Sequence, residues 1–225
     1  ISDLEVVQRE TRGKLYYIKY KLVDSDQNIV IATTRPETMF GDTAIAVHPK
    51  DQRYKDLISK EVIIPISNRK IKIITDDYAD PDQGSGAVKI TPAHDFNDYL
   101  VGKRNKLKLI NILNKDGTLN ENVPKDYINI DRIDARKKLI SELSQQDYLD
   151  KVEDINHTVP YGDRSNSIIE PLLTEQWFVD AKKLSKEAIK QVKKKKTNFF
   201  PDNWKKTYFQ WMENIEPWCI SRQLW

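Results

Sequence analysis

The stretch LYYIKYKL spans residues 15 to 22, and most of it alternates between two kinds of side chain. Successive side chains of a β-strand point to opposite faces of the sheet. One face of this strand would carry the apolar side chains of Tyr16, Ile18, Tyr20 and Leu22, and the other would carry Lys19 and Lys21. The stretch therefore predicts a strand with one buried face and one face in water.

Five more stretches of strand character follow this one, separated by turn-forming clusters such as DSD at residues 24–26 and DPD at residues 80–82. They span residues 28–32, 44–48, 61–66, 70–75 and 87–91. Short strands at this spacing are typical of a barrel or a sandwich. The sequence thus predicts a mixed α/β (α+β) fold in which a β-barrel-like body carries peripheral helices.

Two later stretches have apolar residues at the 3.6-residue period of a helix, residues 131–149 and residues 180–194. Near Asn156 the β-rich pattern gives way to a segment rich in proline and tryptophan. We therefore expect one domain over residues 1–155 and a helical or extended connecting segment over residues 156–225.

The composition excludes several classes of protein. The chain has 225 residues, of which 39% are hydrophobic and 32% charged, which indicates a globular protein rather than a disordered or membrane-embedded one. Its first ten residues lack the pattern of a signal peptide, and one cysteine cannot form a disulfide within the chain. Three histidines show no zinc-binding spacing. We therefore expect a cytoplasmic protein, without a membrane and without a bound metal.

Positive charge is concentrated in one segment. The formal net charge is +3, yet residues 182–206 contain ten lysines and only two acidic residues, Glu187 and Asp202. Such a cluster can attract phosphate groups, and it can equally be a solvated helix face. Both interpretations remain open for the run Lys193 to Lys196.

Polar residues directly follow the strand at residues 28–32, in the order Thr33, Thr34, Arg35, Pro36, Glu37 and Thr38. Proline restrains the residue before it to an extended conformation, so the segment leaves the sheet in a defined direction. It could present its side chains to a pocket. The alternative is an ordinary turn capped by threonine hydroxyls.

A second polar segment, GSGAVKITPAHDFND at residues 84–98, combines a glycine turn, a strand and the start of a helix. Lys89 falls on the strand face opposite Val88 and Ile90. After Pro92 we expect a short helix with Asp95 in its first turn and Gly102 as its end. Asp95 and Asp98 would share one face of this helix, because residues three apart are neighbours. A capped surface helix is the alternative interpretation.

These residue types favour one kind of chemistry. Two neighbouring carboxylates repel each other, and an α-ammonium group between them would relieve that repulsion. Nearby threonine hydroxyls and a lysine could orient a water molecule or stabilise an oxyanion. The combination suits hydrolysis of an amino-acid ester. The sequence shows neither a Ser-His-Asp or Cys-His set nor a glycine-rich phosphate loop, so we expect no covalent nucleophile and no nucleotide cofactor.

Four strings resemble the valyl-tRNA synthetase family: IATTRPETMFGDTAIAVHP (31–49), GSGAVKITPAHDFNDYLVGKR (84–104), VPYGDRSNSIIEPLLTEQWFV (159–179) and WCISRQLW (218–225). The resemblance covers essentially the whole chain and corresponds to the editing insertion and the return into the catalytic core of that family. Neither the HIGH nor the KMSKS signature occurs. The resemblance therefore implies a fragment that hydrolyses, while ATP and Mg²⁺ would serve the catalytic core of a parent enzyme.

The resemblance also implies a substrate and roles for eight residues. The partner would be the tRNA for valine mischarged with threonine, together with the rest of the synthetase. Asp98 would anchor the substrate ammonium, Thr33 and Thr34 would surround the amino acid and water, and Lys89 would recognise the hydroxyl or the ester. Asp95 would shape the site, and Arg35 and Glu37 would stabilise the loop or contact the terminal adenosine. His94 would be a general base or a helix cap.

Two other functions remain open at this point. One is an editing domain of the leucyl or isoleucyl type, which would cleave a different mischarged tRNA. The other is a noncatalytic insertion that only binds and orients tRNA.

Overall fold

The structure is a computed structural model, and it describes residues 6–221. Residues 1–5 and 222–225 lie outside the described residues, and so does the second half of the string WCISRQLW. The chain forms two compact units, Ile1–Leu173 and Thr174–Trp225. No helix within residues 6–221 is long and apolar enough to cross a membrane.

The first unit is built on one seven-stranded sheet. Six strands follow the order β2-β1-β4-β5-β3-β6, and β7 pairs with β1 beside this path. All ladders are antiparallel except that of β3 with β5. The bounds are β1 Val6–Leu22, β2 Asn28–Thr33, β3 Ala44–Val47, β4 Glu61–Ile63, β5 Lys70–Thr75, β6 Ala87–Ile90 and β7 Leu149–Gly162. The six predicted strands are confirmed.

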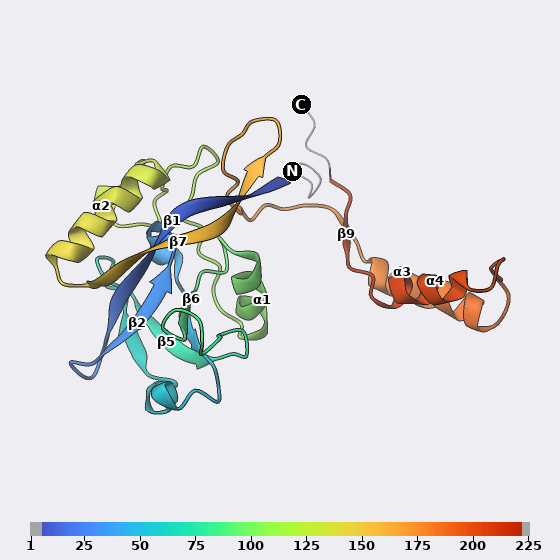
Figure 1. The fold of residues 1–225 in the computed structure, drawn as a ribbon, viewed down its shortest axis with the longest axis horizontal. Helices are drawn as coiled ribbons and strands as arrows, with labels where there is room; N and C mark the ends of the chain where they lie inside the picture. The colour runs from blue at the N-terminus through green and yellow to red at the C-terminus, as the bar shows by residue number, and fades with distance from the viewer. Residues whose placement is uncertain (1–5, 222–225) are drawn as a thin grey trace. The chain divides into compact units, whose positions relative to one another are not determined.

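The sheet curls so that its two end strands meet. β2 and β6 stand at opposite ends of the strand order, yet they contact each other (Figure 1). The result is a half-barrel, which agrees in its general architecture with the barrel-like fold that the sequence predicts. The seam between β2 and β6 is the place where the two polar segments of the sequence come together.

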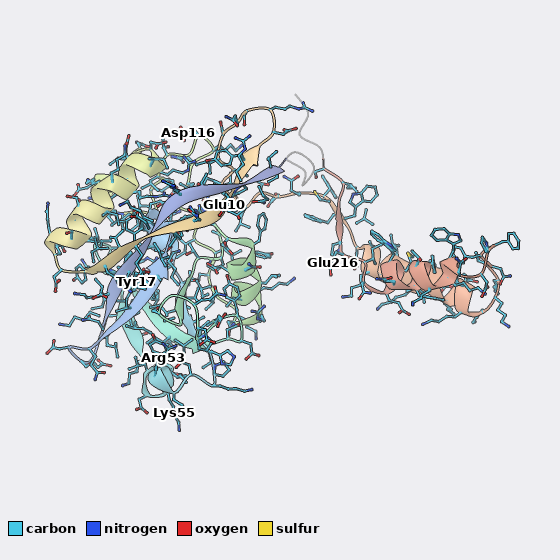
Figure 2. The ribbon with its side chains drawn as sticks, in the orientation of Figure 1. Glu10, Tyr17, Arg53, Lys55, Asp116 and Glu216 are labelled. Carbon is cyan, nitrogen blue, oxygen red and sulfur yellow. The ribbon has the colours of Figure 1, made fainter. Side chains whose placement is uncertain are left out.

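The strand β1 is longer than the sequence predicts, and β7 was not predicted at all. β1 has 17 residues and pairs with β7 in a ribbon whose register runs from Val6 opposite Gly162 to Ile18 opposite Leu149. Tyr17, labelled in Figure 2, donates a hydrogen bond from its hydroxyl to Glu153 of β7 at 2.8 Å. Most of β7 is exposed or half-buried on both faces, so it lacks the alternation that reveals a strand.

The core lies inside the curled sheet and under one helix. Ile18, Tyr20 and Ile31 are fully buried, as the alternation in β1 and β2 requires. The helix α2 (Arg132–Gln145) covers this core with Ala135, Leu139 and Leu143. It begins at the N-cap Asp131, whose carboxylate accepts the N–H of Ile133 at 2.8 Å. The helix predicted at residues 131–149 is thus confirmed, and it ends before Leu149 because that residue begins β7.

Shorter helices complete the first unit. The helix α1 (Phe96–Arg104) follows β6, and it runs past Gly102, which the sequence predicts as its end. Gly102 instead lies against Pro92, where an added Cβ would come within 2.8 Å of the proline ring, so close packing explains this glycine. Three 3₁₀ helices lie in the connections: η2 Pro36–Gly41, η3 Gln52–Leu57 and η4 Lys125–Tyr127.

The boundary between the units differs from the one predicted near Asn156. That residue lies within β7, opposite Arg12 of β1, and the first compact unit continues to Leu173. Because β7 completes the sheet, residues 156–173 belong to the same body as the strands before them. The segment just after β7 also carries Glu170, which contributes to the candidate site described below.

The part of the second unit that the structure describes contains two helices, α3 (Ala181–Lys193) and α4 (Trp204–Glu213), and a pair of two-residue strands, β8 (Phe178–Val179) and β9 (Trp218–Cys219). The two helices pack together, and Lys193 of α3 forms an ion pair with Glu213 of α4 at 3.1 Å. The helix α3 agrees with the prediction for residues 180–194. The helix α4, which has no buried residue, was not predicted.

Candidate functional site

A cavity of about 250 Å³ opens at the seam between β2 and β6. Its wall includes most of the residues that the sequence singles out, namely Thr33, Thr34, Arg35, Lys89, His94, Asp95 and Asp98. Glu37 does not belong to this wall. A larger and more open depression lies beside Asp76 and Arg104, where no predicted site residue is found.

The β2 side of the cavity is formed by the end of that strand. Thr33 is buried, and its hydroxyl oxygen accepts the backbone N–H of Arg35 at 3.1 Å. This bond turns the chain out of the sheet ahead of Pro36, which begins η2. The hydroxyl proton of Thr33 is not used by that bond, so Thr33 can still donate to a ligand. Thr34 is half-buried beside it and also faces the cavity.

The opposite side is formed by β6 and the beginning of α1. Asp95 is the N-cap of α1, and its carboxylate accepts the N–H groups of Asn97 at 2.8 Å and Asp98 at 3.1 Å. Asp98 in turn accepts the N–H of Thr91 at 2.8 Å through Oδ2. The helix start is thereby tied to the strand end, and both carboxylates face the same cavity.

The carboxyl group of Asp98 is nearly buried, with 5% of the residue exposed. Burial raises its pKa from the usual 3.8 to about 6, although Lys89 and the N–H of Thr91 act in the opposite direction. The charges of Asp95 and Asp42 raise it further. Tyr78 lines the same cavity, and burial together with Asp98 and Asp95 raises its pKa to about 12, so this phenol stays neutral. A carboxylate in this environment gains from binding a cation.

The ammonium group of Lys89 is fully occupied by the protein. It donates to Thr38 Oγ1 at 2.8 Å, Thr91 Oγ1 at 2.5 Å and Asp42 Oδ1 at 3.2 Å. A lysine has three N–H donors, and these three bonds use all of them. The predicted direct contact of Lys89 with a substrate hydroxyl is therefore not available in this arrangement, and Lys89 organises the cavity wall instead.

Asp42 is a residue of this network that sequence reasoning missed. It stands just before β3, is completely buried and pairs with Lys89. One signal could have revealed it: a lysine within an apolar strand needs a carboxylate partner, because an unpaired buried charge is costly. Asp42 adjoins the apolar strand β3 and was a candidate for that partner. Thr38, Thr91 and Tyr78 were likewise not assigned to the cavity wall.

His94 does not fit the role of a general base. Its side chain is completely buried, and Nε2 accepts the backbone N–H of Ile112 at 2.9 Å. A neutral imidazole whose one nitrogen accepts a hydrogen bond carries its proton on the other, so no lone pair is left for a water molecule. Burial and the charge of Arg35 lower its pKa to about 4. His94 thus supports the loop after β6, and its assignment to the substrate site stays a prediction.

Glu37, unlike His94, does not line the cavity. It is 1% exposed, and both carboxylate oxygens accept bonds at 2.7 Å from Arg136 of α2. Nearby, Glu170 joins Arg35 to Arg132: it bonds the guanidinium of Arg35 and accepts from Nε of Arg132 at 2.8 Å. Arg35 further donates to the carbonyl of His94 at 2.9 Å. These ion pairs stabilise the loop, which agrees with one of the two roles predicted for Arg35 and Glu37, and a contact of either residue with the terminal adenosine stays a prediction.

Within residues 6–221, no group of three or more histidine, cysteine, aspartate or glutamate side chains is arranged to hold a metal ion. The titratable residues of the cavity wall are two carboxylates, one internally paired lysine, one arginine, one tyrosine and one buried histidine. Together with the threonine hydroxyls, this set can bind an ammonium group and hold a water molecule by hydrogen bonds.

Comparisons with known proteins place the chain in a family. It matches the family described as tRNA synthetases class I (I, L, M and V) over residues 1–225. It is 66% identical over 225 residues to a valine–tRNA ligase of Pelagibacter ubique, covering 100% of this chain and 26% of that protein. It is also 54% identical over 225 residues to the valine–tRNA ligase of Francisella tularensis, and this match covers 100% of this chain and 24% of that protein. The chain spans about a quarter of the length of these curated relatives.

A solved structure overlaps with part of the fold. It is the ternary complex of a LeuRS from Agrobacterium radiobacter K84 with tRNA and LeuAMS, at 20% sequence identity and a TM-score of 0.49. The overlap covers 69% of this chain and 21% of that one. The sequence matches, which extend over every residue, show that this chain belongs to the class I tRNA synthetases and is similar to a segment of valine–tRNA ligases.

Proposed function

We propose that the cavity between β2 and β6 is an editing site, which hydrolyses the ester bond of threonine attached to the tRNA for valine. The observation that carries this proposal is the meeting of Asp98 with Thr33 and Thr34 at one cavity, although they are far apart in the sequence. Its volume of about 250 Å³ is slightly below the ~300 to 1,000 Å³ of sites for drug-sized ligands. That size suits a single amino acid.

The need for such a site follows from the shapes of the two amino acids. Threonine differs from valine by a hydroxyl in place of a methyl group. An apolar pocket cannot strongly reject such an isostere, a known limitation of synthetases for small apolar amino acids, the valine enzyme among them. A second, polar site can make the distinction. It would bond the hydroxyl of threonine, while valine would leave buried polar groups without partners.

In this site the substrate ammonium binds to Asp98. The carboxylate is held in place by the N–H of Thr91, and Asp95 adds a second negative charge nearby. Binding of a cation lowers the pKa of a buried carboxyl group, so the substrate itself favours the ionised form of Asp98. The scissile ester then lies next to the amino group, within reach of the end of β2.

Thr33 and Thr34 complete the site around the ester and the attacking water. The hydroxyl of Thr33 retains its proton for donation, and Lys89 fixes the hydroxyls of Thr38 and Thr91 in the wall. His94 has no lone pair to offer as a base, because Nε2 already accepts a hydrogen bond from the backbone. We infer that the water is activated by its position and by a neighbouring ribose hydroxyl of the tRNA.

The partner in this proposal is the mischarged tRNA, and the reaction needs neither a metal nor a nucleotide cofactor. ATP and Mg²⁺ would serve amino-acid activation elsewhere in a complete synthetase. The proposal also places the protein in the cytoplasm, where tRNA charging takes place.

A deacylation assay tests the proposal. The chain is incubated with tRNA for valine that carries labelled threonine, and release of threonine is followed with the unsubstituted chain and with Asp98→Ala. We expect hydrolysis by the unsubstituted chain and a loss of about 100-fold or more in the variant, because a charged anchor of the reacting group is removed.

The same assay separates the alternatives. If the unsubstituted chain binds this tRNA but does not accelerate its deacylation, the site is a noncatalytic tRNA-binding module. If it cleaves the tRNA for leucine or isoleucine in preference, the specificity is that of a relative. As a control, Asp116→Asn alters a carboxylate in an exposed turn far along the chain from the cavity wall, and we expect it to leave hydrolysis unchanged (Figure 2).

A further inference from the structure

Asp42 is a buried carboxylate behind the wall of the cavity. It has no solvent exposure, and it accepts hydrogen bonds from three side chains: Thr91 Oγ1 at 2.6 Å, Tyr20 Oη at 2.8 Å and Lys89 Nζ at 3.2 Å. Burial raises its pKa, and the three donors oppose this effect. Tyr20 belongs to β1, while Lys89 and Thr91 lie in and just after β6, so Asp42 joins these two strands to the start of β3.

The bonds around Asp42 leave only one pattern of donors and acceptors. An ionised carboxylate can only accept, so the hydroxyl of Thr91 must donate to it and can only accept from Lys89. Thr38 likewise accepts from Lys89 and donates to the carbonyl of Arg35 at 2.8 Å. The two threonine oxygens in the cavity wall therefore keep a lone pair, but no proton, for a ligand.

Two residues keep Asp42 itself in place. Tyr20 lies in the core strand β1 and is completely buried, so its hydroxyl has no access to water as an alternative partner. Arg69 donates to the backbone carbonyl of Asp42 and to that of Phe40, each at 2.8 Å. Both the side chain and the backbone of Asp42 are thus held by the protein.

We propose that Asp42 is a positioning residue for the editing site. Through Lys89 and Thr91 it fixes a part of the wall, the hydroxyl oxygens of Thr38 and Thr91, that can only accept and therefore selects a ligand group able to donate a hydrogen bond. This inference rests on the proposed editing function and extends it to specificity. A threonine hydroxyl can donate to such a wall, whereas the methyl group of valine cannot. Asp42 touches neither substrate nor water in this account.

A double-mutant cycle tests whether Asp42 acts through Lys89. We expect Asp42→Asn to lower kcat/KM for threonyl-tRNA deacylation by about 10- to 100-fold, since small displacements of site residues have effects of this size. In a Lys89→Met background, the same substitution should have little further effect. If Asp42 and Lys89 contributed independently, the fold-losses in kcat/KM from the two substitutions would instead multiply.

Two further variants separate positioning from a general loss of folding. Tyr20→Phe removes one donor to Asp42 and keeps the ring in the core, and we expect a loss of about three- to tenfold in kcat/KM. Asp51→Asn is the matched control: it also removes a buried carboxylate that pairs with a basic side chain, Arg53, and it does not line the cavity. Its kcat/KM should equal that of the unsubstituted chain.

The outcomes distinguish this inference from the proposed function. If the unsubstituted chain does not hydrolyse threonyl-tRNA, both are overturned. If it does, and Asp98→Ala abolishes the activity, the editing function stands. Unimpaired hydrolysis by folded Asp42→Asn or Tyr20→Phe, or losses that multiply in the cycle, would then overturn the positioning role alone. Thermal unfolding of each variant identifies those that are folded at the assay temperature.

Discussion

The carboxylate of Asp98 accepts the backbone N–H of Thr91 at 2.8 Å, and this bond ties the first turn of α1 to the end of β6. One oxygen of the carboxylate is fixed by the bond, while the group as a whole faces the cavity. Since Thr91 also bonds Lys89 and Asp42, the proposed ammonium anchor and the polar wall are parts of one connected arrangement.

The rate of deacylation should depend on the ionisation of Asp98. Burial raises the pKa of this group to about 6, and only the ionised form attracts an ammonium group. We expect kcat/KM to fall as the pH is lowered through about 6, as reported by a pH–rate profile between pH 5 and 8. A profile without an acid limb in this range would contradict the assignment. The rate with Asp116→Asn should follow the profile of the unsubstituted chain.

Because the pKa of Asp98 is raised in the folded state, this residue lowers the free energy of unfolding at neutral pH. The folded state holds a proton on Asp98 that the unfolded chain has already released, so the favourable contribution is complete below the ordinary pKa of 3.8 and is lost as the pH rises through about 6. A difference of roughly two pKa units corresponds to at most about 3 kcal/mol. Asp98→Asn cannot ionise, and its amide oxygen can still accept from Thr91.

We therefore expect Asp98→Asn to raise the free energy of unfolding at pH 8, and to raise it by roughly half as much at pH 5, which lies between the two pKa values, while deacylation is lost. Urea unfolding at the two pH values measures this. Equal effects at both values would show that ionisation of Asp98 is not the cause.

Substitution of His94 should affect stability more than catalysis. His94→Ala leaves the buried N–H of Ile112 without an acceptor, which costs about 1 to 3 kcal/mol. His94→Gln retains a side-chain acceptor and is the matched comparison. We expect both variants, when folded, to deacylate threonyl-tRNA within a few-fold of the unsubstituted chain. Loss of hydrolysis in well-folded His94→Gln would favour histidine catalysis instead.

The lysines at and after the end of α3 can be tested for binding of tRNA phosphates, one of the two interpretations left open for the run Lys193 to Lys196. Lys193 is engaged with Glu213, whereas Lys194, Lys195 and Lys196 are exposed. If these three lysines neutralise phosphates, replacing them with glutamine should reduce the slope of log K against log salt by about 0.7 to 0.9 for each phosphate that is no longer neutralised. The measurement is tRNA binding at several salt concentrations.

The control for this experiment lies in the first unit. Lys50, Lys55 and Lys60 are also exposed, and Lys55 is labelled in Figure 2. Replacing these three lysines with glutamine changes the net charge of the chain by the same amount as the variant of Lys194, Lys195 and Lys196, but in the first unit. Equal effects of the two triple variants, or an unchanged slope, would show that the lysines after α3 are ordinary solvated charges.

Alternation predicts the strands that have one buried face, and it fails for the others. Ile18 and Tyr20 reveal β1 because every second side chain enters the core. Residues 149–162 do not reveal β7, because most of its side chains stay exposed or half-buried on both faces when it pairs with β1 from Val6 to Ile18. The predicted domain boundary differs from the observed one because it was placed at a change of composition near Asn156, whereas the backbone pairing of β7 with β1 continues past that residue.

The residues of the candidate site divide in a similar way. The end of β2 and the start of α1 are visible in the sequence, so Thr33, Thr34, Asp95 and Asp98 could be chosen as cavity residues. Glu37 and His94 have equally suitable chemistry, but the fold directs them to Arg136 and Ile112. Such tertiary partners, like that of Asp42, cannot be derived from local spacing.

The most direct test compares two esters on the same tRNA. The tRNA for valine is charged separately with threonine and with valine, and the first-order rate of deacylation by the chain is measured for each under identical conditions. The account predicts rapid release of threonine and, for valine, a rate close to that without protein. Equal rates for the two esters, or a faster release of valine, would contradict the claim that this cavity recognises the threonine hydroxyl.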